Sequence, residues 1–557
     1  MTTLLLLTLL APAVGAVVAS LVPHDRTGRI LATVFAGVAF VASALLLLGH
    51  TDGGFAYTSG SPVIRPWVQV DLTWVPALDL SFHVGVDGIS YPLVVLTTLL
   101  TLLCCGYTCW HVPASTAAAA AARPTAAAAA ARPTAAAAAA QPMAAAAAAR
   151  PTAAAAAARP IAAAAPTTLA GRHLAALLLV IEVGIVGVFL ALDLVLFFVF
   201  FEIVLLPMYA VIAVWGGENR RHAARKFVLY TLFGSVLLLV GVFTVVAAAG
   251  TADLVVLSSG AGAALPYSVQ LSAFVLLAVA FAVKSPLWPL HTWLPDAHTE
   301  APTVGSVVLA GVLLKMGTYG LLRVAVGVVP DGAAAAAPVL GVLAVAAILI
   351  GGLVCLAQTE LKRLIAYSSV GHMGFVLLGI ATLTATGFQA ALIGNVAHGV
   401  ITGLLFFLVG AVKDRAHTGS LTDLGGLREN APALSGLLGY AAIASLGLPG
   451  LAGFWGEAFA VVASFRRGGP LWTSLGVLAA IGAALAAAYF LRMLRRVTHG
   501  PAAPAVVAGG GGWRLSSAEV YSWAPLVLLA LALGLVPTLV TALSAAPVAA
   551  LTEVVSP

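Results

Sequence analysis

The stretch that decides the fold is AFAVKSPLWPLHTWLPDAHTEAPTVGSVVLAGVLLKMGTYGLLR, residues 280–323. It contains two apolar runs typical of membrane helices, and each run carries one lysine, Lys284 or Lys315. Between the lysines lie four prolines and a polar patch around His298. A lysine near the middle of a bilayer costs about 2.5–3.5 kcal/mol on insertion scales. Two such lysines beside a proline-broken helix therefore indicate an ion pathway.

The composition is that of a polytopic membrane protein. The 557 residues are 61% hydrophobic and only 8% charged, a balance that soluble domains do not have. Residues 1–22 are apolar without a preceding basic region, so we expect a retained first helix, not a cleaved signal peptide. We attribute the net charge of +6 to basic loops on the inner side. The four cysteines lie in apolar runs without metal-ligand spacing, so we expect no metal, no cluster and no structural disulfide.

Runs long enough to cross a bilayer predict an all-α polytopic membrane protein with about 14 transmembrane helices. The predicted spans are residues 3–22, 30–49, 88–110, 174–191, 194–215, 227–249, 269–287, 303–324, 338–357, 364–383, 388–411, 434–463, 471–494 and 523–545. Span seven is broken at Ser285-Pro286 and span twelve within residues 446–453, which read LGLPGLAG. Paired interruptions are typical of inverted repeats. Because the breaks lie five spans apart, we predict two inverted five-helix repeats, spans 4–8 and 9–13.

Changes in composition divide the chain into five regions. We expect N-terminal helices over 1–110, a low-complexity cytoplasmic insert over 111–170, a first repeat over 171–325, a second repeat over 338–496, and a C-terminal helix within 497–557. In the insert, proline recurs every nine residues between alanine runs, which prevents one long helix. We interpret it as a peripheral expansion, with a partner-binding arm as the alternative.

The distribution of basic residues predicts the orientation of the chain. With the N-terminus outside, about 20 of the 26 Lys and Arg residues fall in inner loops. Lys284 and Lys315 stay in the membrane. The residues placed outside are Arg65, Arg323, Arg466 and Arg467. The opposite orientation would reverse the excess, so we expect both termini on the outer side.

Seven ionisable side chains fall deep inside the predicted spans. They are Glu182, Glu202, Lys284, Lys315, His372, His398 and Glu457. Each one alone could be a structural polar group that joins two helices, and we favour that interpretation for a lone histidine such as His372. Together they alternate between acid, base, imidazole and acid along the chain. Such an inventory favours a proton relay.

The order of these groups suggests how the relay would work. We expect Glu202 to pair with Lys284 and hold it charged, and withdrawal of the carboxylate would send the proton on to Lys315. His372 and His398 could then bridge through water, because imidazole titrates near neutrality. Glu457 would be the last station before the outer side. No cofactor is required in this chain.

Several stretches resemble the antiporter-like membrane subunits of respiratory complex I, the NADH-quinone oxidoreductase. They are residues 82–101, 189–217, 360–380 and 446–460, which include ELKRLIAYSSVGHMGFVLLGI and LGLPGLAGFWGEAFA. The resemblance implies that Glu202 and Lys284 form the working pair. The further matched positions are Lys315, His372 and His398. Glu457 occupies a site where the sister chains L and N, and the related Mrp antiporter chains, typically have lysine.

This resemblance also implies a cellular setting. The chain would lie in the bacterial plasma membrane, within the membrane arm of an NADH:quinone oxidoreductase, beside other subunits and especially the sister chains L and N. Flavin, iron–sulfur clusters and quinone would belong to partner subunits, and nucleic acid would not be bound. The alternatives are an Mrp-type Na⁺/H⁺ antiporter subunit, against which Glu457 argues, and the membrane subunit of a hydrogenase-linked complex.

Overall fold

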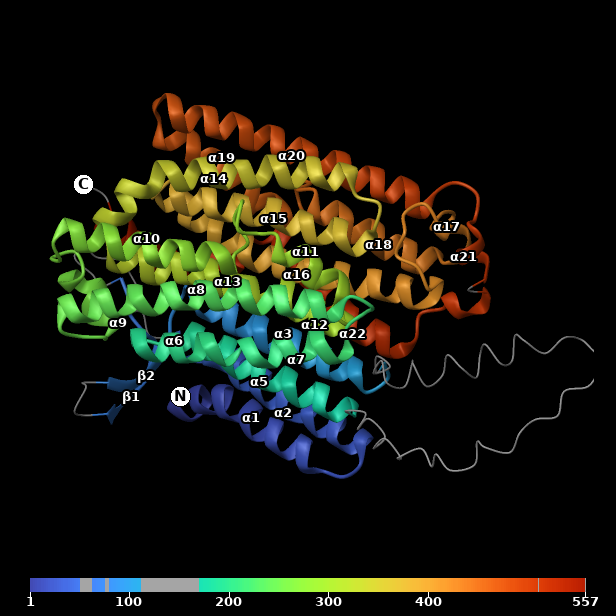
Figure 1. The fold of residues 1–557 in the computed structure, drawn as a ribbon, viewed down its shortest axis with the longest axis horizontal. Coiled ribbons are helices and arrows are strands. Elements are labelled where there is room, and N and C mark those ends of the chain that lie inside the picture. The colour runs from blue at the N-terminus through green and yellow to red at the C-terminus, as the bar shows by residue number, and fades with distance from the viewer. Residues whose placement is uncertain (51–62, 76–79, 112–169, 509, 556–557) are drawn as a thin grey trace, which may run out of the picture.

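The computed structural model describes residues 1–50, 63–75, 80–111, 170–508 and 510–555. Within these residues, 13 helices are long and apolar enough to cross a membrane. They run side by side along the horizontal axis of Figure 1. The predicted class, an all-α polytopic membrane protein, is therefore confirmed. The predicted insert over 111–170 lies outside the described residues, apart from its two end positions.

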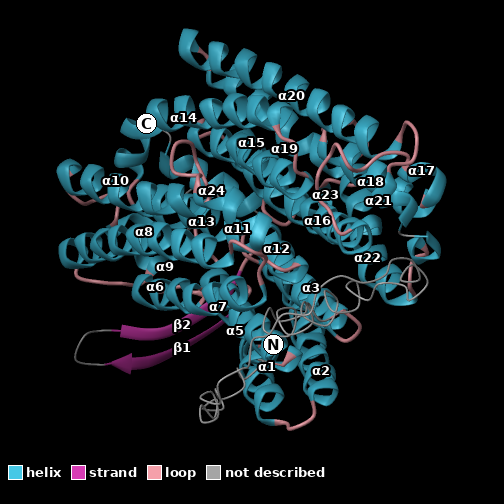
Figure 2. Cartoon of the chain, turned by 45° about the vertical axis from the view of Figure 1, so that its right-hand side comes forward, coloured by secondary structure: helices cyan, strands magenta, loops and turns pink. Residues whose placement is uncertain are grey.

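The first part of the chain forms three helices and a hairpin. Their bounds are α1 (Thr2–Leu21), α2 (Asp25–Leu45, continued by a 3-10 turn, Leu46–His50), β1 (Val68–Val75), β2 (Leu80–Val86) and α3 (Tyr91–Thr108). The strands pair in antiparallel register, with Val70 opposite Val84, and Figure 2 draws them in magenta. They were not expected from the hydrophobic runs, because β1 is short and largely exposed.

The second part of the chain contains spans four to eight. The helices are α5 (Gly171–Leu190), α6 (Leu194–Ile203), α7 (Leu205–Trp215), α8 (Arg220–Ala249), α9 (Leu254–Val256), α10 (Tyr267–Lys284), α11 (Trp293–Glu300), α12 (Thr303–Val308) and α13 (Leu314–Gly320). Three π-helical segments accompany them, at Leu257–Ala261, Leu309–Leu313 and Leu321–Val326. The span over Thr303–Val326 is buried along its whole most apolar window, so it forms the centre of the bundle.

The remaining helices complete the bundle around this centre. They are α14 (Pro330–Ala357), α15 (Leu361–Ala381), α16 (Ala385–Ala416), α17 (Leu427–Asn430), α18 (Pro432–Ser445), α19 (Ala452–Arg467), α20 (Gly469–Thr498), α21 (Pro504–Ala508), α22 (Ser517–Leu535), α23 (Thr538–Thr541) and α24 (Ala545–Val555). A 3-10 turn, Gly510–Trp513, lies between α21 and α22.

Both predicted breaks are present. Helix α10 ends at Lys284, and the chain leaves regular helix until α11 begins at Trp293. Proline lacks the N–H that a continuing helix needs, and two prolines lie in this gap. Span twelve is divided into α18 and α19 by a turn in which Gly447 and Gly450 have φ of 77° and 90°, values that favour glycine. The inverted relation between the two sets of five spans stays a prediction.

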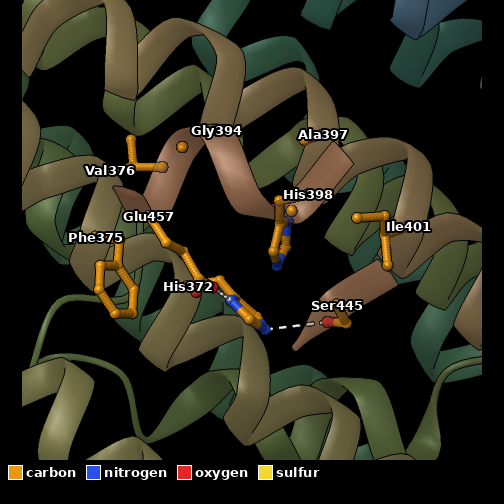
Figure 3. Close-up of a pocket in the computed structure, with 11 residues that line it drawn as sticks. His372, Phe375, Val376, Gly394, Ala397, His398, Ile401, Ser445 and Glu457 are labelled. Atoms are coloured by element: carbon orange, nitrogen blue, oxygen red, sulfur yellow. Dashed lines mark hydrogen bonds and ion pairs between the residues drawn. The ribbon is translucent and has the colours of Figure 1, made fainter. Parts of the chain in front are cut away.

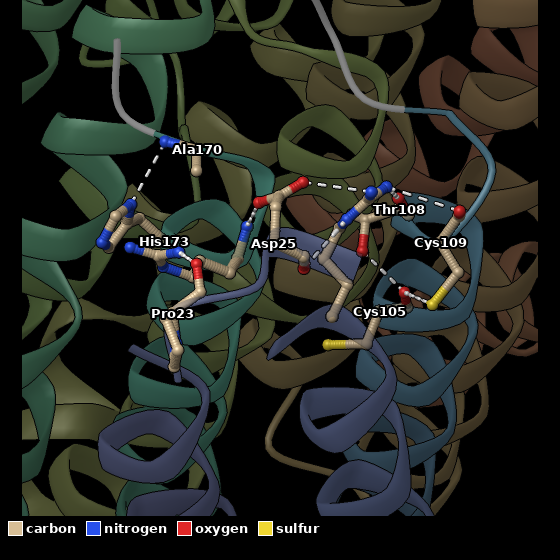
Figure 4. Close-up of polar contacts among 9 residues, drawn as sticks. Pro23, Asp25, Cys105, Thr108, Cys109, Ala170 and His173 are labelled. Carbon is tan, nitrogen blue, oxygen red and sulfur yellow. Dashed lines mark hydrogen bonds and ion pairs between the residues drawn. The ribbon is translucent and has the colours of Figure 1, made fainter. Parts of the chain in front are cut away.

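The ends of the bundle can be distinguished by their connections. The hairpin end contains β1, β2 and α9, at the left of Figure 1, and the opposite end contains α17 and α21. At that opposite end, the start of α2 forms hydrogen bonds with the two segments that flank the insert, the end of α3 and the start of α5 (Figure 4). The Asp25 carboxylate accepts a hydrogen bond from the backbone N–H of Arg172 at 2.7 Å. Arg29 donates to the carbonyl of Thr108 at 2.6 Å. This fixes the end of α3 beside the start of α5.

Candidate functional site

Lys315 and His398 form the buried centre of the site. Lys315 lies on α13, between two π-helical segments, and its side chain is fully buried. Its Nζ donates a hydrogen bond to the carbonyl of Ala310 at 2.5 Å and lies 2.6 Å from Nδ1 of His398 on α16. A lysine ammonium has donors only, so Nδ1 of His398 acts as the acceptor. Nε2 of His398 is buried and has no hydrogen-bond partner in the described part of the chain.

A second pair lies next to the first. Nδ1 of His372 on α15 is 2.9 Å from Oε1 of Glu457 on α19, and its Nε2 is 3.1 Å from Oγ of Ser445, the last residue of α18. The ring centres of His372 and His398 are 5.8 Å apart. Figure 3 shows both imidazoles and Glu457 facing one small space.

The space between the two histidines is a cavity of about 20 Å³. Its lining includes His372, His398, Ser445 and Glu457. Most of the lining is apolar, but a cavity of this size is large enough for one water molecule, which needs about 10–15 Å³ by this measure. The break in span twelve positions two of these groups, because Ser445 ends α18 and Glu457 lies in the second turn of α19. Lys315, His398, His372 and Glu457 are thus brought together, and their part in proton transfer stays a prediction.

Lys284 lies at the end of α10 and is 2% exposed. Its Nζ lies 4.6 Å from the ring centre of Phe201, a cation–π distance. Among the described residues no ion pair within 4 Å joins Lys284 to Glu202, and Oε1 of Glu202 has no partner. The predicted contact between the two is therefore not made in this structure. Pro207 explains a local irregularity beside Glu202, because its ring removes the helical bond to the carbonyl of Ile203, where α6 ends.

Helix α13 approaches the Lys284 break closely at Gly317. A Cβ added at Gly317 would lie 2.7 Å from both the Phe281 carbonyl oxygen and the Ser285 nitrogen. Only glycine allows this approach, which brings the backbone two residues from Lys315 against the end of α10. The two lysine-bearing segments are thereby packed together.

Glu182 is not brought to the other site residues. It lies on α5 and is fully buried, and neither carboxyl oxygen has a hydrogen-bond partner among the described residues. Burying an unpaired carboxylate is costly, so the neutral acid is the form that this environment favours. Its role in transport stays a prediction.

Sequence reasoning did not place His298 among the site residues. His298 lies on α11, is fully buried, and stacks on Phe406 with ring centres 4.5 Å apart. Both ring nitrogens lack partners in the described residues. The signal available in the sequence was its place in the polar patch between Lys284 and Lys315.

A cavity of about 360 Å³ opens at the end of the bundle opposite the hairpin. Its lining includes Glu300, Lys362, Lys413 and Asp414. Lys362 was expected among the inner loop residues, but its side chain is 4% exposed and its Nζ donates to the carbonyl of Ala301 at 3.0 Å. Lys362 is thus a further buried lysine, close to the segment that carries His298.

Arg323, which the charge count placed on the outer side, is not a loop residue. Its side chain is buried in the π-helical end of span eight and forms an ion pair with the buried Asp87, which precedes α3. Asp87 also accepts hydrogen bonds from the N–H groups of Ile89 and Ser90 at 3.1 and 3.0 Å. The hydrophobic pattern shows where a span lies, but it does not show that a distant carboxylate compensates a charge at its end.

Comparison with known proteins identifies the family. The family described as NADH:quinone oxidoreductase/Mrp antiporter, TM, matches residues 191–482. NADH-quinone oxidoreductase subunit M of Rhodobacter capsulatus is 37% identical over 541 residues, covering 95% of this chain and 91% of that protein. The chain belongs to this family of antiporter-like membrane subunits. As the resemblance implied, it is a multi-pass membrane subunit of the NADH-quinone oxidoreductase class, and its buried charged residues are those of a proton-translocating subunit.

Solved structures share the fold. A chain of respiratory complex I from Thermus thermophilus with bound NADH has a TM-score of 0.77 and 27% identity, with 99% of this chain and 100% of that chain covered. A chain of the Mrp complex from Dietzia sp. DQ12-45-1b has a TM-score of 0.75 at 22% identity, covering 99% of this chain and 52% of that chain. The second likeness shows a common fold alone. No group of three or more His, Cys, Asp or Glu in the described residues is arranged to hold a metal ion.

Proposed function

We propose that the chain conducts protons along Lys284, Lys315, His398, His372 and Glu457, driven by quinone reduction in partner subunits. The observation that carries this proposal is the arrangement of two hydrogen-bonded pairs, Lys315–His398 and His372–Glu457, on either side of a cavity that fits one water molecule. A purely structural role would require only that each charge be neutralised. It would not require two imidazoles and a carboxylate facing the same small cavity.

Two of the transfers in this path, Lys315 to His398 and His372 to Glu457, have their donor and acceptor in hydrogen-bond contact. Lys315 gives a proton to Nδ1 of His398, and His398 gives up its other proton from Nε2 toward the cavity. A water molecule, or the hydroxyl of Ser445, passes a proton to Nε2 of His372. His372 then releases its Nδ1 proton to Glu457. The donor and acceptor atoms of the two direct transfers are 2.6 and 2.9 Å apart. After a transfer each imidazole carries its proton on the opposite nitrogen. It returns to its starting form when the ring flips or when a proton moves back to the first nitrogen.

Lys284 would supply the proton that reaches Lys315. When Glu202 approaches Lys284, it favours the charged ammonium, and when Glu202 withdraws, the ammonium faces Phe201 and loses its strongest stabilising partner. In the structure the two side chains form no direct ion pair, although the charge of Glu202 still acts on Lys284 from beyond contact distance. Gly317 packs the end of α10 against α13, so the two helices that carry Lys284 and Lys315 are direct neighbours.

We place proton entry at the cavity lined by Lys362 and Asp414. His298 lies behind the Ala301 carbonyl that Lys362 contacts, and its two free ring nitrogens could pass protons inward. The charge count along the sequence puts this end of the bundle on the inner side of a bacterial plasma membrane, with both termini outside. The sister chains L and N would be the neighbours in the membrane arm, and flavin, iron–sulfur clusters and quinone would be held by partner subunits.

The function can be tested in the assembled oxidoreductase in inverted membrane vesicles. Lys284→Ala should leave assembly intact and reduce NADH-driven proton translocation by roughly 10²-fold, the lower range for loss of an acid–base group. NADH oxidation coupled to translocation should fall with it. An assembled Lys284→Ala variant that translocates protons at the unmodified rate would refute the proposed pathway.

A further inference from the structure

Helix α11 is the short helix that follows the Lys284 break, and it packs between α8 and α15. Helix α8 is span six, within the first predicted set of five spans, and α15 is span ten, within the second. Figure 1 shows α11 over the middle of the bundle, between these two groups. The contacts of α11 therefore link the segment after the Lys284 break to both sets of spans, in addition to the direct packing of α10 on α14.

Asp296 on α11 is shared by cations from both sides. Its Oδ2 lies 2.7 Å from Nζ of Lys226 on α8, and its Oδ1 lies 3.5 Å from Nη1 of Arg363 on α15. One carboxylate thus contacts the first set of spans through one oxygen and the second set through the other. Oxygen atoms of a carboxylate can each accept from a separate cation.

Neighbouring hydrogen bonds also connect the ends of α11 to α8 and to α15. Tyr230 on α8 hydrogen-bonds Thr292 at 2.8 Å, and Lys362 on α15 donates to the carbonyl of Ala301 at 3.0 Å. Asp296 is distinguished from these because it alone, among these contacts, joins both helices through one side chain. Its side chain is 22% exposed, and those of Lys226 and Arg363 are 27% and 42% exposed. Ion pairs at such exposure add little to stability.

The elements that Asp296 joins carry the relay. Helix α11 follows directly from the segment of Lys284, and α15 carries His372, nine residues after Arg363 or roughly 14 Å along the helix. When Glu202 approaches or leaves Lys284, α11 would shift. The ion pair of Asp296 with Arg363 would then displace α15 in the same direction. The ion pairs are weak enough to re-form as the helices move, yet they keep the helices in register.

We propose that Asp296 is a positioning residue that couples the Lys284 half of the pathway to the His372 half. This inference rests on the proposed function, since it concerns how the two halves of the same proton pathway act together. Asp296 does not carry the proton. It makes the position of α15 depend on the position of α11.

The test uses the assembled oxidoreductase in inverted membrane vesicles and compares proton translocation with NADH oxidation. Asp296→Asn keeps the shape and removes the charge, so translocation per NADH oxidised should fall by about fivefold or more, the lower end of coupling between sites. Asp296→Glu should restore most of it. Asp423→Asn is the matched control, because Asp423 is exposed and hydrogen-bonds Thr418 and Thr422 within its own loop. It should leave the ratio unchanged.

Cation variants distinguish coupling from simple support. Lys226→Met or Arg363→Met breaks one side of the link, so each should lower the ratio as Asp296→Asn does, and combination with Asp296→Asn should add nothing. Additive losses, or a ratio equal to that of the unmodified protein in Asp296→Asn, would overturn the inference. If Asp296→Asn fails to assemble, the Lys226→Met and Arg363→Met pair decides by the same criterion. Lys284→Ala in the same series separates the two proposals, because normal translocation there would refute the pathway itself.

Discussion

Nζ of Lys315 lies 2.6 Å from Nδ1 of His398, and the same Nζ reaches the carbonyl of Ala310 at 2.5 Å. Because Ala310 lies in a π-helical segment, its carbonyl is placed where the lysine on the next helical turn can use it. The ammonium therefore has two acceptors inside the bundle, one fixed and one that can take the proton. In the proposed pathway, this asymmetry would direct the proton from Lys315 toward the cavity beside His372.

Glu457 should be the acceptor at the far side of that cavity. Glu457→Gln keeps the size and hydrogen bonding of the side chain but cannot take the proton from His372, so proton translocation should fall by roughly 10²-fold. Glu457→Asp should retain part of the activity, because a carboxyl group remains. Glu457→Lys should also be partly tolerated, given the lysine typical of the sister chains. The measurement is NADH-driven acidification of inverted vesicles, and the exposed Glu429→Gln serves as control. Equal translocation by assembled Gln and Asp variants would show that Glu457 does not titrate.

The Asp87–Arg323 ion pair should stabilise the hairpin end of span eight. Removing one partner leaves a buried charge uncompensated, which typically costs about 3–5 kcal/mol. Asp87→Asn and Arg323→Met should therefore each lower the thermal midpoint of the detergent-solubilised complex. The double variant should lie above the lower of the two singles, because no unpaired charge remains. If the double variant lowers the thermal midpoint by the sum of the two single decreases, Asp87 and Arg323 do not form a specific stabilising pair.

The contact of His83 with Asp253 should make the anchoring of the hairpin depend on pH. Nδ1 of His83 lies 2.9 Å from Oδ2 of Asp253, and its Nε2 lies 3.3 Å from Oε1 of Gln69. Burial alone would lower the pKa of His83, but the hydrogen bond and charge of Asp253 outweigh it and raise the pKa above 6.5. For Asp253, burial would raise the pKa, but the hydrogen bond from His83 lowers it below 3.8.

The sign of the effect follows from these directions. The contribution of His83 is fully present below its unfolded pKa and is lost as pH rises through the raised folded pKa. The contribution of Asp253 is present above its unfolded pKa and is lost as pH falls through the lowered folded pKa. Amide exchange in β2, corrected for its intrinsic pH dependence, should therefore speed up as the medium becomes alkaline. His83→Gln should lack that step. The same step in His83→Gln would assign the pH dependence to another group.

The sequence predicted the spans and most of the buried charged groups for a physical reason. A charged residue inside an apolar run can be recognised in the sequence itself, so Lys284, Lys315 and Glu457 could be found without knowledge of packing. The broken helices were likewise predictable, because proline and glycine interrupt the backbone locally. The pairing of Lys315 with His398 needed the structure, since it depends on which faces of two distant helices meet.

What the sequence did not predict depends on three-dimensional proximity. Arg323 could be recognised as buried only once Asp87 was seen beside it, and Lys362 only once Ala301 was seen to receive its ammonium. The expected pairing of Glu202 with Lys284 involves two helix irregularities, so their separation is set by how the breaks are packed. The hairpin escaped prediction because short, half-exposed strands leave little trace in a pattern of hydrophobic spans.

The most direct test of the account concerns Lys315, the lysine at the centre of the buried relay. The measurement is the initial rate of NADH-driven proton uptake into inverted vesicles that contain the assembled complex, compared between Lys315→Met, Lys315→Arg and the unmodified protein. Methionine fills the space of lysine without a proton, and arginine holds its proton too tightly to pass it on. The account predicts that both variants assemble and that both lose translocation by roughly 10²-fold. Translocation at the unmodified rate in assembled Lys315→Met vesicles would contradict it.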